Sequence, residues 1–223
     1  MSTRQASPRR RTRSSGRAPA GVLLALVLAI LSAFAGCSAA VVTPVGSGGS
    51  PYQGVYLDTP YQLPQATLIG TDGKDFDLRT GSDKPVLVLY FGYTNCPDIC
   101  LGQLTDIATA LNRVDADVRE KIQVIFITVD PDRDTPDVIR DYLARIDPDF
   151  VGLTAPLPTV KAVGAAMGVV VEGTTPTGDG YDVTHSDQVI AFDSRRLGRL
   201  VWTQGTSIGT LRSDFTQFVR QQP

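Results

Sequence analysis

The chain has 223 residues, 42% of them hydrophobic, and a formal net charge of −2 at pH 7. Residues 1–36 contain six arginines and no acidic residue, so the remainder holds 15 basic against 23 acidic residues, a formal charge of −8. This acidic balance argues against nucleic acid as a partner, because the phosphate backbone attracts basic proteins.

The N-terminal segment has the order of features of a secretory signal. An arginine-rich start is followed by an apolar run over residues 22–30 and by small residues that end at Cys37. The run is shorter than the roughly 20 residues that span a bilayer. Its end resembles a bacterial lipoprotein box, with Phe34 in place of the usual leucine and Cys37 as the lipidated residue. We expect residues 1–36 to be a signal peptide, with an uncleaved anchor helix as the alternative; both place the domain outside the cytoplasmic membrane.

The next segment, residues 37–54, is rich in glycine, serine and proline and lacks periodicity. This composition is typical of a flexible tether that holds a domain away from a membrane. The folded domain is expected over residues 55–223, a length that suffices for one domain with a substantial core.

Hydrophobic patterns and turn signals predict alternating strands and helices in this domain. Asp72-Gly73 indicates a hairpin, and Thr135-Pro136 is a strong helix start. The order implies an α/β fold with a mixed central sheet, helices on both faces and an added N-terminal β-hairpin. The predicted elements are strands 65–69, 76–78, 86–91 and 121–129, helices 97–113, 136–146 and 157–167, an extended piece 169–171, a polar loop 173–180, strands 189–192 and 200–202, and a closing helix 208–220.

Two cysteines follow the apolar strand 86–91. Pro97 favours the first helical position and keeps the preceding residue non-helical, so Cys96 should lie at the helix mouth and Cys100 one turn inside. The positive end of the helix dipole stabilises thiolates, so we expect lowered cysteine pKa values. This arrangement indicates either redox chemistry or a soft-metal site.

The residues alone leave a disulfide and a metal centre open. A plain Cys96–Cys100 disulfide fits an exported domain, although thioredoxin-type reductases usually have two residues between their cysteines and this chain has three. His185 is the only histidine, and it lies between a glycine-rich loop and a strand. Two thiolates and one imidazole suit Cu(I), whereas structural zinc nearly always takes four ligands.

Three aspartates, Asp130, Asp132 and Asp134, resemble the start of a calcium loop. Such a loop needs glycine at its sixth position and glutamate at its twelfth, where this chain has Thr135 and Asp141. We therefore reject a calcium site, and expect the aspartates to cap the following helix and to place negative charge near the cysteines.

Three motifs together resemble the SCO/SenC family of copper-delivery proteins. They are Phe91–Cys100 (FGYTNCPDIC), Val129–Pro136 (VDPDRDTP) and Val183–Ser186 (VTHS), in the order and approximate spacing of that family. The resemblance covers roughly residues 56–218, and it implies a thioredoxin-like fold.

The resemblance also implies that copper is bound by Cys96, Cys100 and His185. The expected ion is Cu(I), and Cu(II) is a further candidate. Leu101 and Thr184 depart from the family pattern, in which proline and aspartate are frequent at these positions. The second departure removes a possible orienting carboxylate beside the histidine.

By resemblance, the protein is expected to be a copper metallochaperone on the extracytoplasmic face of a bacterial membrane, anchored through lipid on Cys37. Its partner would be the cytochrome c oxidase subunit that carries the dinuclear CuA centre; the copper donor is left open. The alternative is a thiol–disulfide reductase in which Cys96 attacks and Cys100 resolves. A peroxide-reducing relative is a weaker alternative, because the arginine that such chemistry uses cannot be placed.

Overall fold

The computed structural model describes residues 50–223 except Asp98 and Asp179. The predicted signal peptide, Cys37 and residues 37–49 of the predicted tether lie outside the described residues. Within the described part, no helix has the length and apolar character needed to cross a membrane.

Ordered contacts begin before residue 55. Tyr52 is buried, and the backbone amides of Gln53 and Gly54 donate to the Asp214 carboxylate at 3.0 and 2.8 Å. The Trp202 indole donates to the same carboxylate at 2.9 Å. The end of the predicted tether is therefore bound to the closing helix through Asp214, a carboxylate that it shares with Trp202.

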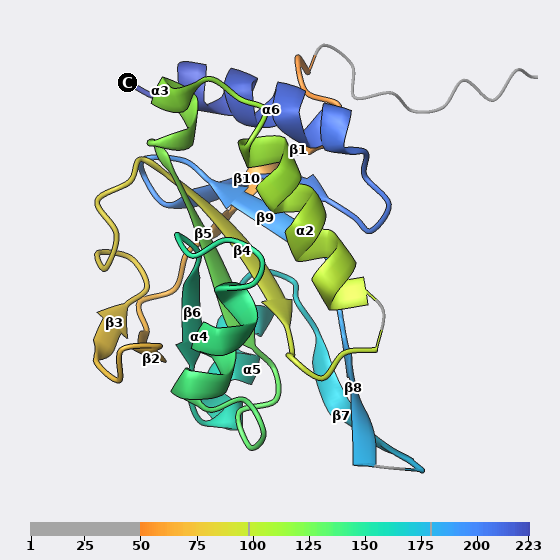
Figure 1. The fold of residues 1–223 in the computed structure, drawn as a ribbon. Coiled ribbons are helices and arrows are strands. Elements are labelled where there is room, and N and C mark those ends of the chain that lie inside the picture. The colour runs from red at the N-terminus through yellow and green to blue at the C-terminus, as the bar shows by residue number, and fades with distance from the viewer. Residues whose placement is uncertain (1–49, 98, 179) are drawn as a thin grey trace, which may run out of the picture. The chain divides into compact units, whose positions relative to one another are not determined.

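A mixed sheet of eight strands forms the centre of the domain (Figure 1). Its order is β1-β10-β9-β4-β5-β6-β2-β3; β4 is parallel to β5 and antiparallel to β9. All residues of β4 are buried, as its continuous apolar run predicts. The strands are β1 (Val55–Gln62), β2 (Thr67–Gly70), β3 (Asp75–Asp77), β4 (Val86–Gly92), β5 (Ile122–Thr128), β6 (Val151–Thr154), β9 (Val189–Phe192) and β10 (Leu197–Trp202).

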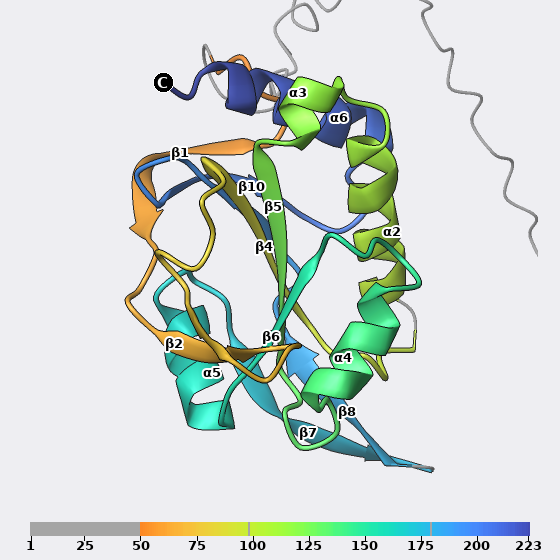
Figure 2. The same ribbon diagram turned by 60° about the vertical axis from the view of Figure 1, so that its left-hand side comes forward.

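Helices cover both faces of this sheet, as predicted. Figure 2 shows α2 and α4 on one side and α5 on the other. Helix α2 packs against α6, and α4 packs against β6. The helices are α2 (Ile99–Leu111), α3 (Ala116–Arg119), α4 (Pro136–Leu143), α5 (Leu157–Ala165) and α6 (Ile208–Arg220).

The prediction of a polar loop over residues 173–180 is wrong. This segment belongs to a second, two-stranded sheet, in which β7 (Val171–Thr177) pairs antiparallel with β8 (Gly180–His185). All residues of β7 after Val171 are exposed, so the strand lacks the apolar alternation that marks a half-buried strand. The hairpin extends away from the central sheet (Figure 1) and has His185 at its base.

Candidate metal centre

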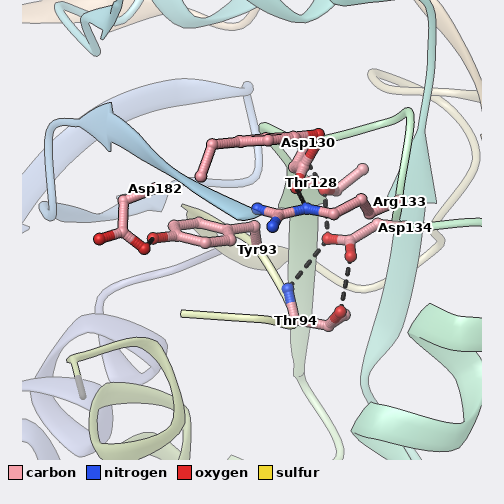
Figure 3. Close-up of polar contacts among 8 residues, drawn as sticks. Tyr93, Thr94, Thr128, Asp130, Arg133, Asp134 and Asp182 are labelled. Atoms are coloured by element: carbon pink, nitrogen blue, oxygen red, sulfur yellow. Dashed lines mark hydrogen bonds and ion pairs between the residues drawn. The ribbon is translucent and has the colours of Figure 1, made fainter. Parts of the chain in front are cut away.

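The loop between β4 and α2 is fixed by a buried carboxylate on the neighbouring connection. Asp134 accepts hydrogen bonds from the Thr94 amide at 2.9 Å, the Thr94 hydroxyl at 2.6 Å and the Thr128 hydroxyl at 2.6 Å (Figure 3). The helix start predicted at Thr135-Pro136 is confirmed: Thr135 caps α4 by accepting from the Val138 amide at 3.4 Å. The expectation that Asp134 caps this helix is wrong. The aspartate instead holds the backbone just before the cysteines.

The two cysteines lie at the start of α2, as predicted, but the helix begins at Ile99 and not at Pro97. Cys96 precedes the helix and is half-buried, whereas Cys100 is in its first turn and fully buried. The Cys100 amide donates to the Cys96 sulfur at 3.5 Å. No disulfide joins the two residues in this structure.

The expectation of a lowered pKa is wrong for Cys100. A hydrogen bond with Cys96 and burial together raise the pKa of the Cys100 thiol. The sulfur lies against Gly92, where an added Cβ would be 3.1 Å away, so water cannot stabilise a thiolate there. The helix-dipole argument underestimates the cost of removing this sulfur from water.

His185 meets the buried cysteine across the base of the hairpin. Its Nε2 lies 3.9 Å from the Cys100 sulfur, and its Nδ1 lies 2.7 Å from the Ser186 carbonyl oxygen. Because a carbonyl can only accept, Nδ1 carries the hydrogen in the neutral ring and donates it to Ser186. The Nε2 lone pair is then available toward the sulfur. The Ser186 carbonyl thus orients the His185 ring, a role that an aspartate at position 184 could otherwise have had.

The chemistry of these donors suits a soft monovalent metal. A sulfur and a nitrogen bonded to one metal at about 2.3 and 2.0 Å lie a little under 4 Å apart at open bond angles, close to the observed separation. No group of three histidine, cysteine or acidic side chains in the described residues forms a complete cage. Cys100 and His185 are therefore brought together, and Cys96 lies beside them without closing the set.

A pocket of about 230 Å³ opens beside this site. Cys96, Pro97 and Ile99 line one side, and residues of β8 that include His185 line the other. Cys100 does not line the pocket and lies beneath it, fully buried. A ligand that enters would meet Cys96 and His185 before it reaches Cys100.

Sequence reasoning assigned no role to Arg133 or Tyr181, which lie close to this site. Asp130 forms an ion pair with Arg133 and accepts a hydrogen bond from the Tyr181 hydroxyl at 2.8 Å. Arg133 lies in the motif Val129–Pro136, so its position was visible, but nothing local indicates that its partners come from a hairpin near residue 181.

Comparisons with known proteins identify the family that this chain matches. A family model described as SCO1/SenC matches residues 58–220. A "Putative copper-binding protein" of Stutzerimonas stutzeri is 33% identical over 124 residues, 56% of this chain and 60% of that protein. "Protein SCO2, mitochondrial" of Saccharomyces cerevisiae is 38% identical over 112 residues, 50% of this chain and 35% of that protein. The matched stretch thus spans less than two thirds of either relative.

Solved structures share the fold. Arabidopsis thaliana ScoI with copper bound has a TM-score of 0.65 at 26% identity, covering 71% of this chain and 98% of that one. Yeast Sco1 with copper bound has a TM-score of 0.65 at 27% identity, covering 74% and 91%. The predicted thioredoxin-like fold is confirmed, and copper is bound in these homologous structures.

Proposed function

Because the chain belongs to the SCO1/SenC family, we propose that it is a copper metallochaperone that holds Cu(I) through Cys96, Cys100 and His185. The observation that carries the proposal is the approach of the His185 Nε2 atom to within 3.9 Å of the Cys100 sulfur. The hydrogen-bonded Nδ1 leaves Nε2 as a donor. Copper in two homologous structures supports the same cargo.

The proposed loading begins at the pocket and ends in the interior. Cu(I) would meet Cys96 first and would then reach Cys100, which is hydrogen-bonded with Cys96. Thiols lose their protons when they bind a metal, so loading releases protons. A hydrogen bond with Cys96 and burial raise the pKa of Cys100, and the same burial would keep water from the bound ion.

The proposed acceptor is the cytochrome c oxidase subunit that carries the CuA centre, since a Sco relative is described as belonging to a family of oxidase assembly proteins. The proposed anchor is lipid on Cys37, which would hold the domain at the extracytoplasmic face of a bacterial membrane. Transfer of copper from the loaded protein to the isolated CuA-bearing domain tests the destination.

His185→Ala is expected to lower the Cu(I) affinity of the reduced protein by at least about tenfold, because one of three donors is lost. Competition with a chromophoric Cu(I) chelator measures this change. The rate at which the cysteines exchange with a small disulfide should stay close to wild type, since the ring donates no hydrogen bond to either sulfur when its proton is on Nδ1. Unchanged Cu(I) affinity would remove His185 from the metal centre.

The second candidate function is thiol–disulfide reduction, which the hydrogen bonds between Cys96 and Cys100 favour. Cys96 would attack a substrate disulfide and Cys100 would release the product, so that two electrons and two protons pass from the thiols to the substrate. The same variant separates the two functions. His185→Ala should leave a reductase active, whereas it removes a metal ligand from a copper carrier.

A further inference from the structure

The hairpin that carries His185 has few contacts that hold it in place. Its strands, β7 and β8, contact mainly each other, and the described buried residues in them are Val171 and Val183. A two-stranded hairpin is marginally stable by itself in water. The position of the imidazole therefore depends on the side chains that attach β8 to the rest of the domain.

Arg133 attaches the hairpin to a different part of the chain. Its guanidinium carbon lies 3.8 Å from the centre of the Tyr181 ring, which belongs to β8, and 5.7 Å from the centre of the Tyr93 ring. Figure 3 shows the guanidinium reaching toward Tyr93, which follows β4 and precedes the cysteines. The Tyr93 ring in turn meets the His185 ring edge-on, with centres 5.9 Å apart.

Asp130 holds the arginine in this position. Its carboxylate is buried, pairs with Arg133 and accepts the Tyr181 hydroxyl hydrogen at 2.8 Å. The Arg133 Nη2 atom is buried and has no hydrogen-bond partner among the described residues, as expected for a guanidinium that packs on an aromatic face. The Tyr93 hydroxyl adds a long hydrogen bond of 3.4 Å to Asp182 on β8.

The connection between β5 and α4 therefore contacts both halves of the donor set. Asp134 fixes the cysteine loop through Thr94, and Asp130 with Arg133 fixes the hairpin through Tyr181. Arg133 itself cannot bind a metal, because a guanidinium is always protonated and has no lone pair to donate. Its effect on a metal would pass through the position of His185.

We propose that Arg133 is a positioning residue: stacked on Tyr181 and paired with Asp130, it keeps His185 within reach of Cys100. The part of this inference that concerns copper rests on the proposed function. The part that concerns the hairpin does not, because the contacts exist without metal. The two parts can therefore be tested separately.

Hydrogen exchange of the purified full-length protein without copper tests the hairpin. Arg133→Gln and Tyr181→Leu are expected to speed amide exchange in residues 171–185 by about tenfold, because each removes the stacked pair. Tyr181→Phe keeps the ring and should retain most of the protection. The control is Arg140→Gln, which removes an exposed ion pair with Asp137 on α4 and should leave exchange in the hairpin unchanged.

Equal exchange in wild type and Arg133→Gln would overturn the proposal. So would equal acceleration by the phenylalanine and leucine variants, because the ring would then not be the attachment. Both results are obtained without copper, and they stand whatever the metal measurements give.

A double-mutant cycle tests the link to copper. Arg133→Gln is expected to weaken Cu(I) binding about tenfold when His185 is present, and to have no further effect in a His185→Ala background. A penalty that persists without the histidine would mean that Arg133 acts by its charge or on the general fold, and would overturn the positioning role. If the wild type binds no Cu(I), the proposed function fails, and hydrogen exchange alone decides the role of Arg133 in the hairpin.

Discussion

Cys100→Ser is expected to lower the Cu(I) affinity by more than about 100-fold. Losing a ligand should cost more than losing a residue that only hydrogen-bonds to a ligand. A hydroxyl is a poor ligand for a soft monovalent ion, and serine keeps nearly the size of cysteine. Cys100 is fully buried and its sulfur is closely packed against Gly92, so a small substitution is needed to keep the fold. Cys96→Ser should have a comparable effect.

The measurement is Cu(I) competition on the reduced full-length protein, with thermal unfolding to verify that each variant is folded. Cys37→Ser is the matched control, because it replaces the third cysteine of the chain, which lies outside the expected site. Its affinity should equal that of the wild type. A folded Cys100→Ser protein that keeps wild-type affinity would rule out the metal centre as proposed.

Asp134→Ala is expected to lower the free energy of unfolding by about 3 kcal/mol. The carboxylate is fully buried and accepts three hydrogen bonds, so its removal leaves the Thr94 amide, the Thr94 hydroxyl and the Thr128 hydroxyl without this partner. The backbone before Cys96 also loses its attachment. Cu(I) affinity should therefore fall together with stability.

Urea unfolding followed by circular dichroism measures this effect. The control is Asp137→Ala in the first turn of α4, just after Asp134, where the carboxylate is exposed and pairs with Arg140 on the surface. Exposed ion pairs contribute little, so that variant should lose at most about 1 kcal/mol. If both variants unfold at the same urea concentration, the hydrogen bonds of Asp134 do not hold the cysteine loop.

Several elements could be predicted because their signals are local. The apolar run at β4 predicts a strand buried on both faces, and Thr135-Pro136 predicts the start of α4; both agree with the structure. Helix α6 spans the predicted residues 208–220. In each case a short pattern of apolar residues or a capping residue specifies the conformation without distant partners.

Other elements could not be predicted from local patterns. Strand β1 mixes exposed and half-buried residues, and its pairing with β10 shifts between Tyr56 and Tyr61, so it lacks a regular alternation. Strand β6 is short, at four residues. The exposed strand β7 resembles a loop in composition. These strands exist because a neighbouring strand offers hydrogen bonds, and that neighbour is distant in sequence.

The sequence by itself determined which donors are available: two cysteines one helical turn apart and a single histidine. Only the tertiary structure decided that residues 100 and 185 meet and that the Ser186 carbonyl selects the ring nitrogen facing the sulfur. It also decided that a hydrogen bond with Cys96, together with burial, raises the Cys100 pKa. The physical reason is that local patterns report backbone conformation. Contact across 85 positions and exclusion of water arise only when the sheet, the hairpin and the connection at Asp130–Asp134 pack together.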